Sequence, residues 1–359
     1  MTAVIPRPGA AAVVACHDRG MDQGESLRDD ARAGRAARSR RRVGVGERAL
    51  LVAMAALLVP FLARLTGVEA GPLAYAVAFT PWFTLCWLVL VVVAAVVRAP
   101  RALVVSGIVA AVSVAWVVPL FTSSPSVDYD ALGVAPGDTF KVATINATFG
   151  RVDADEVVAM VDDAAVDVLA VEELTPDCLD ALVAAGLDGM LPYSRTAAED
   201  GFGGVGLWSR MPLVDDAEID GFTSRAVLGS VEVGGDAVAV LAAHPAAPGP
   251  FSHEAWAADL ELLATVTSAV EGPAMIVGDL NSTLDHAGLR TLESDGFVDA
   301  ADDGGAGLQL TFPEGRLPFP VVAIDHVMTR GLDWDAYAVR TLPLTGADHR
   351  ALVVTYALD

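Results

Sequence analysis

The sequence predicts a chain in two unlike parts: about three transmembrane helices, followed by one α/β or α+β domain built from two face-to-face β-sheets flanked by helices. Three observations support this fold class. Apolar runs without charged residues fill most of the region 46–121. From Phe140 onward, short apolar segments of strand length alternate with amphipathic segments of helix length. The net charge also changes sign between the two regions.

Charge distinguishes the two regions most clearly. Residues 1–121 contain 13 Lys and Arg against 7 Asp and Glu, a net charge of +6, whereas residues 122–359 contain 10 against 39, a net charge of −29. A domain this acidic repels phosphate backbones, so a nucleic-acid partner is not expected. Bound divalent cations would reverse the sign locally. No feature of the sequence indicates a protein partner.

The N-terminal region contains three apolar runs behind a basic tail. Residues 1–45 show no apolar periodicity, which predicts a disordered tail. The runs 73–97 and 102–121 contain no charged residue, and each is long enough to span a hydrocarbon core of about 30 Å as a helix. The first run, 49–63, is shorter and is bounded by arginines. It either crosses the bilayer with snorkelling arginines or lies in the interface.

The positive-inside rule gives the expected topology. Arg98 and Arg101, between the second and third apolar runs, should be cytoplasmic, and so should the basic tail. Both conditions are met if the first run also crosses, which gives three transmembrane helices over 46–121. The linker 122–138 and the domain 139–359 are then extracytoplasmic. The chain is therefore expected to be a multi-pass protein of the cell (plasma) membrane.

The acidic region begins with the strand pattern "KVATIN" (141–146). A helix follows, with Asp153 as its N-cap, and then the buried-strand pattern "VDVLAVEEL" (166–174). The helical spacing of apolar residues predicts a longer helix over 253–270. Further strands are predicted at residues 204–209, 230–233, 237–244, 274–279, 321–329, 336–340 and 351–357.

Polar side chains lie at the end of almost every predicted strand. One of them alone would indicate a turn, a cap or a solvated edge. Six such positions, each with a side chain suited to a metal ion or a phosphate, instead predict a single convergent site. Asp285, His286 and His326 either support this site or have a structural role only. Four of these positions follow strands: Asn146, Glu172 with Glu173, His244, and Asp279 with Asn281. Asp325 and His326 lie inside the predicted strand 321–329, and Asp348 and His349 lie just before the last strand.

The order of these motifs resembles the endonuclease/exonuclease/phosphatase superfamily. The series comprises an Asn after the first strand, a Glu after "DVLAVE", then "GVGLWSR", a strand-ending His, "GDLN", "IDHV" and "DHR". The resemblance covers about residues 139–359. It implies a four-layer α/β sandwich of two mixed sheets with helices outside, and a metal-dependent hydrolase of phosphoric esters or pyrophosphates.

The resemblance also implies roles for individual residues. Glu173 is similar to the family's metal-binding glutamate, and Asn146 and Asp348 are similar to residues at the metal and the phosphate. Thr148 departs from the pattern, because some members have an acidic residue at this position. The implied catalytic residues are Asp279 and Asn281, which orient water and hold a phosphate oxygen, His244 on the phosphate side, and the carboxylate–imidazole pair Asp325 and His349.

The chemistry of these residues agrees with the resemblance. Mg²⁺ takes oxygen ligands, with one or two carboxylates beside water and substrate phosphate, and Glu173 with Asp348 would suffice. We therefore expect Mg²⁺ or Mn²⁺, which would neutralise negative charge as water attacks phosphorus. Asp325 would fix the tautomer of His349 and stabilise its cationic form, so that the imidazolium can donate to a phosphoryl oxygen or a leaving group.

The apolar region narrows the expected function. A three-helix anchor before an extracytoplasmic domain of this superfamily is similar to the VanJ-like membrane phosphatases, as is the Thr-aromatic-Pro element in "LTFPEGRLPFPVVAIDHV". This resemblance implies a membrane lipid phosphate as the substrate, a polyprenyl pyrophosphate or a similar ester in the bilayer. Two alternatives are a surface nuclease or phospholipid/sphingomyelin phosphodiesterase, and a non-catalytic surface binding protein with the same fold.

Overall fold

The computed structural model describes residues 32, 46–122, 138–249 and 253–358. Contacts divide the chain into two compact units, Met1–Ala56 with Cys86–Ala110 and Leu57–Leu85 with Ala111–Asp359. The second, larger unit contains both β-sheets. Apart from residue 32, the predicted disordered tail lies outside the described residues, and so does almost all of the predicted linker, so these two features stay predictions.

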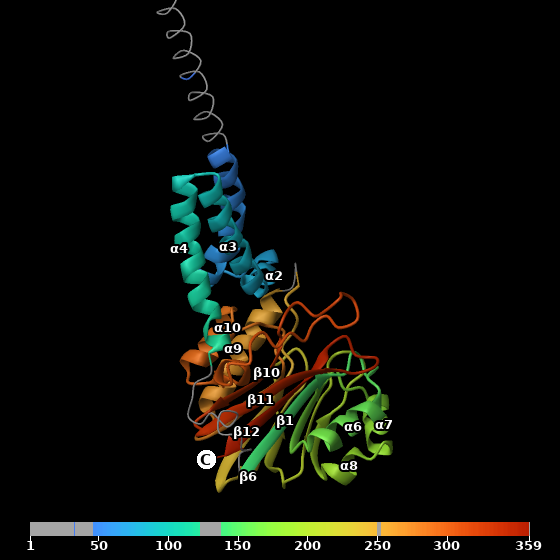
Figure 1. Ribbon diagram of the computed structural model, residues 1–359. Coiled ribbons are helices and arrows are strands. Elements are labelled where there is room, and N and C mark those ends of the chain that lie inside the picture. Colours follow the sequence, from blue (N-terminus) through green and yellow to red (C-terminus); the bar gives the residue numbers. More distant parts are fainter. Residues whose placement is uncertain (1–31, 33–45, 123–137, 250–252, 359) are drawn as a thin grey trace, which may run out of the picture. The chain divides into compact units, whose positions relative to one another are not determined.

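Apolar helices precede the sheets. Two described helices are long and apolar enough to cross a membrane, Gly46–Thr66 and α4, Pro100–Val117. A third candidate is formed by α2, Pro72–Ala78, and α3, Thr80–Val96, which meet at a bend of 70°. Pro81 favours a new helix start at this bend, since proline has no N–H and suits the first turn. The described chain therefore has two candidate spans, or three if the bent pair crosses once (Figure 1).

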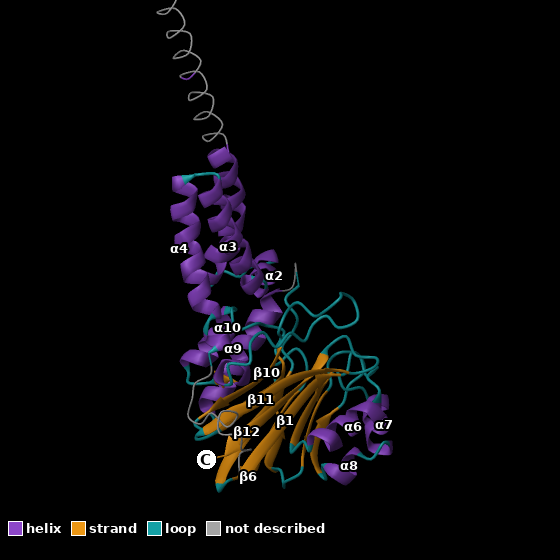
Figure 2. Ribbon diagram, in the orientation of Figure 1, coloured by secondary structure: helices purple, strands orange, loops and turns teal. Residues whose placement is uncertain are grey.

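Twelve described strands form two mixed six-stranded sheets (Figure 2). The first sheet has the order β11–β12–β1–β2–β4–β3, with β1 and β2 parallel. Its strands are β1 (Asp138–Asn146), β2 (Val168–Glu172), β3 (Tyr193–Ala197), β4 (Val205–Ser209), β11 (Trp334–Pro343) and β12 (Arg350–Leu358). The second sheet has the order β5–β6–β7–β8–β10–β9, with β7 and β8 parallel. Its strands are β5 (Val214–Glu218), β6 (Ala226–Val233), β7 (Asp236–Ala243), β8 (Ala274–Asp279), β9 (Val298–Asp299) and β10 (Asp325–Arg330).

Helices cover the outer face of each sheet. Alternation along β1 sends Phe140 and Val142 into the core between the sheets, and Ala143 and Ile145 toward the helices. The predicted four-layer α/β sandwich is therefore confirmed (Figure 1). The helices on the first sheet are α6 (Ala154–Ala164), α7 (Pro176–Ala184) and α8 (Leu187–Met190), those on the second are α9 (His253–Ala269) and α10 (Ala287–Ser294), and the short helices are η1 (Pro119–Phe121) and α11 (Ala300–Asp303).

Several elements form where the local sequence predicts them. The Asp153 carboxylate caps α6 by accepting a hydrogen bond from the Glu156 backbone N–H at 3.1 Å. The apolar run of β2 is buried along its whole length, as its uninterrupted pattern indicates. The predicted helix over 253–270 is α9, which buries Trp256 and Leu260 against the second sheet.

Strand direction identifies the end of the sandwich that holds the candidate site; this end is called the functional edge below. The carboxyl ends of β1, β2, β7 and β8 lie there. β10 starts at the same edge because it pairs antiparallel with β8, so that Asp325 lies opposite Asp279. β12 also starts there, because it pairs antiparallel with β1 and brings Leu352 opposite Thr144. The polar residues at six predicted strand ends therefore meet at one edge.

Leu207 tests the core between the sheets, where its side chain is fully buried. Leu207→Ala should lower the free energy of unfolding by about 2–5 kcal/mol, because truncation removes buried contacts and leaves a cavity. Val183→Ala, at an exposed position of α7, should change it by less than about 0.5 kcal/mol. Denaturant unfolding of the detergent-solubilised chain, followed by tryptophan fluorescence, measures both variants. Equal effects would contradict the core position of Leu207.

Candidate active site

Two buried carboxylates form the centre of the site. Asp279, at the end of β8, and Asp325, at the start of β10, are directly opposite each other in the antiparallel pair. Asp279 Oδ2 accepts a hydrogen bond from Asn146 Nδ2 at 2.9 Å, and Asp279 Oδ1 accepts one from the Asn281 backbone N–H at 2.9 Å. Both carboxylates are almost fully buried, so their charges need a nearby cation.

His349 supplies a positive charge between these carboxylates. Its Nδ1 lies 3.0 Å from Asp325 Oδ2, and its Nε2 lies 3.7 Å from Asp279 Oδ2. Burial alone would lower the pKa of His349, but Asp325 and Asp279 raise it to about 10. Conversely, burial alone would raise the pKa of Asp279, but His349 and His244 lower it far below its usual range. At neutral pH the site therefore holds an imidazolium between two carboxylates.

Asn146 joins the carboxylates of the two sheets. Its Nδ2 donates to Glu173 Oε1 at 3.1 Å as well as to Asp279. Its Oδ1 accepts a hydrogen bond from the Thr148 backbone N–H at 2.8 Å, which fixes the orientation of the amide. Glu173 Oε2 accepts a further hydrogen bond from the Phe149 N–H at 2.7 Å. The Glu173 carboxylate is thus held at the rim and is only partly buried.

Thr148 departs from the expected motif pattern, and it contacts Asp348. Its hydroxyl donates to Asp348 Oδ1 at 2.8 Å and accepts a hydrogen bond from the Asp348 backbone N–H at the same distance. Asp348 Oδ2 pairs with Arg316 Nη2 at 2.7 Å. Both oxygens of Asp348 therefore already accept a hydrogen bond, and its role as a metal ligand stays a prediction.

His244 and Asn281 complete the site on the second sheet. Asn281 Nδ2 lies 3.2 Å from His244 Nε2 and donates to Pro245 O at 3.0 Å. Burial would lower the pKa of His244, but Asp279, whose Oδ2 lies 3.5 Å from His244 Nε2, raises it. The structure thus brings the eight predicted site residues into one network of hydrogen bonds and ion pairs, although their catalytic roles stay predictions. They are Asn146, Glu173, His244, Asp279, Asn281, Asp325, Asp348 and His349.

Glu172 has an environment that the sequence did not indicate. Its side chain is fully buried between the sheets, where the Thr144 hydroxyl lies 3.0 and 2.9 Å from its two carboxylate oxygens. Burial, reinforced by Asp325, raises the pKa of Glu172 well above its usual range. Burial therefore favours the protonated form of the Glu172 carboxyl, which has a structural position beside the site. Its inward position follows from the alternation of side chains along β2.

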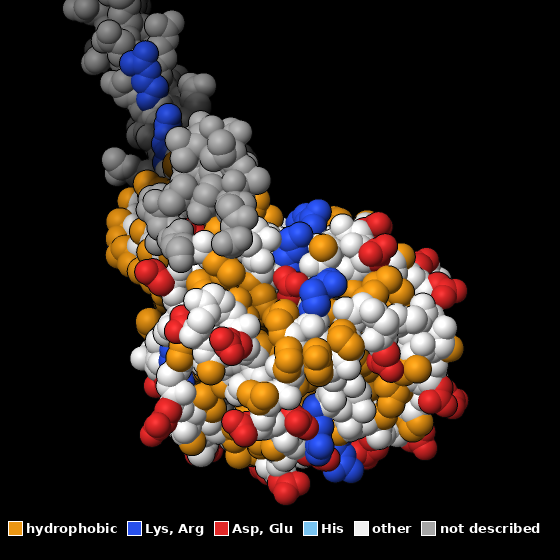
Figure 3. All heavy atoms as spheres, turned by 90° about the horizontal axis from the view of Figure 1, so that it is seen from below, with side chains coloured by type: hydrophobic (Ala, Val, Ile, Leu, Met, Phe, Trp, Pro, Cys, Tyr) orange, Lys and Arg blue, Asp and Glu red, His pale blue; other side chains and the backbone are white. Residues whose placement is uncertain are grey.

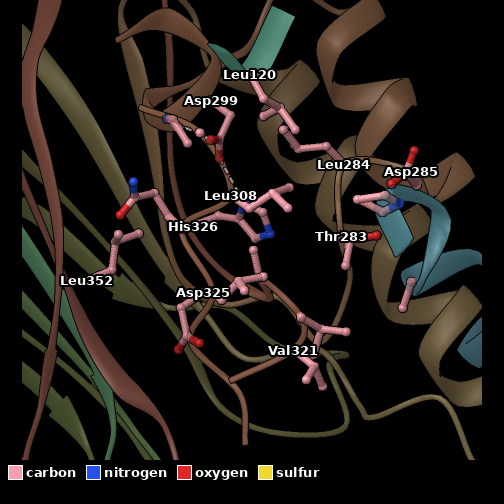
Figure 4. Close-up of a pocket in the computed structure, with 18 of the residues that line it drawn as sticks. Leu120, Thr283, Leu284, Asp285, Asp299, Leu308, Val321, Asp325, His326 and Leu352 are labelled. Atoms are coloured by element: carbon pink, nitrogen blue, oxygen red, sulfur yellow. Dashed lines mark hydrogen bonds and ion pairs between the residues drawn. The ribbon is translucent and has the colours of Figure 1, made fainter. Parts of the chain in front are cut away.

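Asp285, His286 and His326, for which the sequence left the role open, have structural contacts next to the site. His326 Nδ1 lies 2.7 Å from Asp299 Oδ2, and His326 Nε2 lies 2.8 Å from Ser282 O, so this side chain ties β10 to the segment after Asn281. Figure 4 shows the Asp325 carboxylate pointing away from this pair. The cavity in this view has a volume of about 50 Å³, which is room for water and not for a substrate.

Asp285 and His286 bind the segment that precedes α3. Asp285 Oδ1 pairs with Arg64 Nε. The His286 ring accepts a hydrogen bond from the Thr283 N–H at its Nδ1, so its Nε2 carries the proton and donates to Ala74 O at 2.9 Å. Both residues therefore attach Arg64 and Ala74 of the apolar N-terminal region to the β-sandwich within the larger unit, and neither takes part in the network around His349.

A comparison with protein-family models assigns the chain to a family. The model of a family described as "Endonuclease/Exonuclease/phosphatase family" matches residues 143–349, more than half of the sequence. The chain belongs to this family. Its matched segment contains the whole network, from Asn146 to His349. A search of curated proteins found no match.

Solved structures support the same fold. Humanized TDP2 of D. rerio superposes with a TM-score of 0.51 and 14% identity, over 61% of this chain and 98% of that one. D. rerio TDP2 complexed with a single-strand DNA product gives a TM-score of 0.51 and 14% identity, over 61% and 99%. A functionally unknown conserved protein from Enterococcus faecalis gives 0.50 and 16%, over 61% and 100%. At these identities the similarity shows the fold alone.

Members of this family are metal-dependent phosphoester hydrolases, and the donor set of this chain fits a divalent cation. Asp279, Asp325 and His349 offer ligand atoms within 4.8 Å of one another. Asp325 Oδ1 is buried and has no hydrogen-bond partner in the part of the chain that the structure describes. Because an imidazolium has no free lone pair, the carboxylate oxygens of Asp279 and Asp325 suit the cation better than the His349 ring does. Glu173, at the rim, stays a predicted ligand. Oxygen ligands suit hard divalent cations, and the choice of Mg²⁺ or Mn²⁺ stays a prediction.

Glu173→Gln should lower phosphoester hydrolysis by about 100-fold or more, because it keeps the shape and removes a carboxylate suited to the metal. Glu172→Gln should change the rate little, because burial already favours the protonated form of Glu172 and glutamine keeps its shape. Initial rates of EDTA-treated protein, measured across a Mg²⁺ titration, compare the two variants. A dead Glu172→Gln beside a fully active Glu173→Gln would reverse the assignment of these neighbours.

Proposed function

We propose that the chain is a membrane-anchored, divalent-metal-dependent phosphoesterase with an extracytoplasmic active site, which hydrolyses a lipid (polyprenyl) pyrophosphate or a similar membrane phosphate ester. One observation carries the catalytic part of this proposal: the His349 ring lies between Asp325 and Asp279, beside the Asn146–Glu173 pair. This arrangement offers carboxylates to a metal ion, and the His349 ring to a phosphoryl group, at the same edge.

Asp279 and Asn281 would orient the attacking water. Asp279 is ionised at neutral pH, because His349 and His244 lower its pKa, so its carboxylate can accept a hydrogen bond from water. The Asn281 backbone N–H holds that carboxylate in place. The Asn281 amide and His244, 3.2 Å apart, would bind a phosphoryl oxygen.

His349 would protonate the leaving group. As water forms a bond to the terminal phosphorus, the bond from that phosphorus to the bridging oxygen breaks, and the bridging oxygen takes a proton from His349. The water gives up a proton, which restores the imidazolium through Asp279 or solvent. The products are inorganic phosphate and a lipid monophosphate. A divalent cation, when bound, would neutralise charge on the phosphoryl oxygens.

Contacts within the larger unit support the extracytoplasmic placement. Each apolar segment contacts the catalytic domain through one of its ends. These are the ends that the expected topology assigns to the extracytoplasmic side of the membrane. Arg98 and Arg101 follow the opposite end of α3, and the positive-inside rule assigns that end to the cytoplasm. The contacts are Arg64 with Asp285, Trp82 with Val321, and Leu120 with Gly307.

A nuclease is the second candidate function. D. rerio TDP2, which has a similar fold, was crystallised with a single-strand DNA product. The net charge of −29 over residues 122–359 opposes DNA binding by this chain. A lipid headgroup in the bilayer avoids most of this repulsion, since it brings two phosphates and no long polyanion.

The substrate class can be tested with the full-length protein in detergent. With Mg²⁺ or Mn²⁺ it should release inorganic phosphate from an isoprenyl pyrophosphate, leave plasmid DNA intact, and lose activity in EDTA. Nicking of the plasmid without phosphate release would favour the nuclease. Inactivity toward both substrates across a range of metals would contradict a phosphoesterase.

His349→Ala should lower turnover by about 10²–10⁴-fold, because it removes the expected proton donor and positive charge. Asp325→Asn should cause a smaller loss, since the imidazole stays while its orientation and charge support are weakened. His253→Ala, at the start of α9, is the control. Phosphate release under saturating Mg²⁺ measures all three. Full activity of His349→Ala would exclude the proposed proton donor.

Asp236→Cys tests the orientation of the catalytic domain, because Asp236 is exposed at the start of β7, directly after the turn from β6. In a background with Cys16, Cys86 and Cys178 replaced by serine, this thiol should react with an impermeant maleimide on intact cells. Ser39→Cys in the basic N-terminal region should react only after lysis. The reverse pattern would place the catalytic domain in the cytoplasm.

A further inference from the structure

A hairpin over residues 311–322 lies against the catalytic network. Its two sides meet at the bridge between Phe312 and Val322. The Phe312 ring lies 4.7 Å from the His349 ring, centroid to centroid, and the Glu314 N–H donates to Asp348 O at 2.7 Å. The hairpin is therefore fixed to two consecutive residues of the site.

Arg316 extends from this hairpin to the site and has no role in the mechanism above. Its Nη2 lies 2.7 Å from Asp348 Oδ2, while 63% of its side chain is exposed. Within the described residues this is the one hydrogen bond of its guanidinium group. The other N–H groups are free to bind a ligand at the mouth of the site.

Arg151 approaches the same place from the first sheet. Its Nε donates to Thr148 O at 3.0 Å, and its guanidinium carbon lies 5.6 Å from the Phe149 ring centroid. The Thr148 hydroxyl donates to Asp348, the partner of Arg316. Two exposed guanidinium groups are thus attached to the Thr148–Asp348 pair, next to Glu173.

Arg151 and Arg316 are positively charged residues in a strongly acidic domain, which indicates a role in binding an anion. Residues 122–359 contain 10 basic against 39 acidic residues, and Figure 3 shows acidic side chains along much of the edge of one face, with basic side chains in a few groups. An exposed ion pair such as Arg316–Asp348 adds little to stability. Cations at the mouth of the site would instead offset the repulsion of an incoming polyanion.

We propose that Arg316, assisted by Arg151, binds the phosphate that is not attacked in a pyrophosphate substrate. This inference rests on the proposed function and names a subsite for it. The terminal phosphate would lie at Asp279 and His349, and its neighbour would lie outside, beside Asp348. The planar guanidinium group of arginine binds phosphate oxygens in pairs and keeps its charge at any physiological pH.

Apolar residues of the hairpin indicate which of the two phosphates of the substrate Arg316 would bind. Leu317 and Phe319 are about half exposed, and the Phe319 ring centroid lies 6.2 Å from that of Trp82. Trp82 Nε1 also donates to Val321 O at 2.8 Å. Because Trp82 lies in the first turn of the apolar helix α3, the hairpin leads from the site toward the proposed membrane segment. The phosphate at Arg316 is therefore the one attached to the lipid.

Catalysis of two related substrates by the full-length chain tests the subsite. Arg316→Gln should lower kcat/KM for a short isoprenyl pyrophosphate by about 10–100-fold, because a charge-assisted contact is lost, and should change that for the corresponding monophosphate by less than about threefold. Arg316→Lys should retain part of the activity. Arg210→Gln is the matched control, since Arg210 is exposed and pairs with Asp167 at 3.1 Å, at the opposite end of β2. Equal losses on both substrates, or no loss, would overturn the proposal.

Binding provides a readout that needs no turnover. Calorimetry with Mg²⁺ should show the wild-type chain binding methylene bisphosphonate, a non-hydrolysable pyrophosphate analogue, at least about tenfold more tightly than inorganic phosphate. Arg316→Gln should abolish that difference, and Arg210→Gln should keep it. If the wild type distinguishes the two anions but hydrolyses neither isoprenyl ester, the proposed function fails and the subsite stands. If it hydrolyses the pyrophosphate without distinguishing the anions, the subsite fails alone.

Discussion

The repulsion between two buried carboxylates is the constraint on which the site depends. Asp279 and Asp325 lie directly opposite each other on β8 and β10, where like charges destabilise a sheet. Their burial leaves little water to screen them. His349 lies between them and offsets this repulsion, and the two carboxylates in turn keep its imidazole protonated. The start of β12 and the packing of Phe312 both serve to hold that ring in place.

The same repulsion explains why the two neighbouring glutamates, Glu172 and Glu173, have different environments. A third ionised carboxylate inside the sandwich would add to the repulsion, and burial beside Thr144 favours the protonated form of Glu172. Glu173 points to the rim, where a backbone N–H and the Asn146 amide share its charge. The charge that is left at the rim suits a divalent cation, and the arginines at the mouth suit the anion that the cation would help to bind.

The sequence could predict the fold and the convergence of the site, because both follow from local patterns. Apolar alternation defines the strands, and polar residues at their ends meet once strand direction is known. The state of Glu172 could not be read from two adjacent glutamates without the depth of β2 in the core. Arg316 lies in a hairpin without periodicity, and its partner Asp348 is remote in sequence. The contact between Arg64 and Asp285 likewise depends on the tertiary arrangement, since 221 positions separate the two residues.

In the proposed mechanism, water at Asp279 attacks a terminal phosphorus directly while His349 protonates the bridging oxygen. A single turnover of an isoprenyl pyrophosphate in oxygen-18 water, with both products analysed by mass spectrometry, is the decisive test of this mechanism. One labelled oxygen in the inorganic phosphate and none in the isoprenyl monophosphate is the predicted result. Label in the isoprenyl monophosphate, or unlabelled inorganic phosphate, would contradict it.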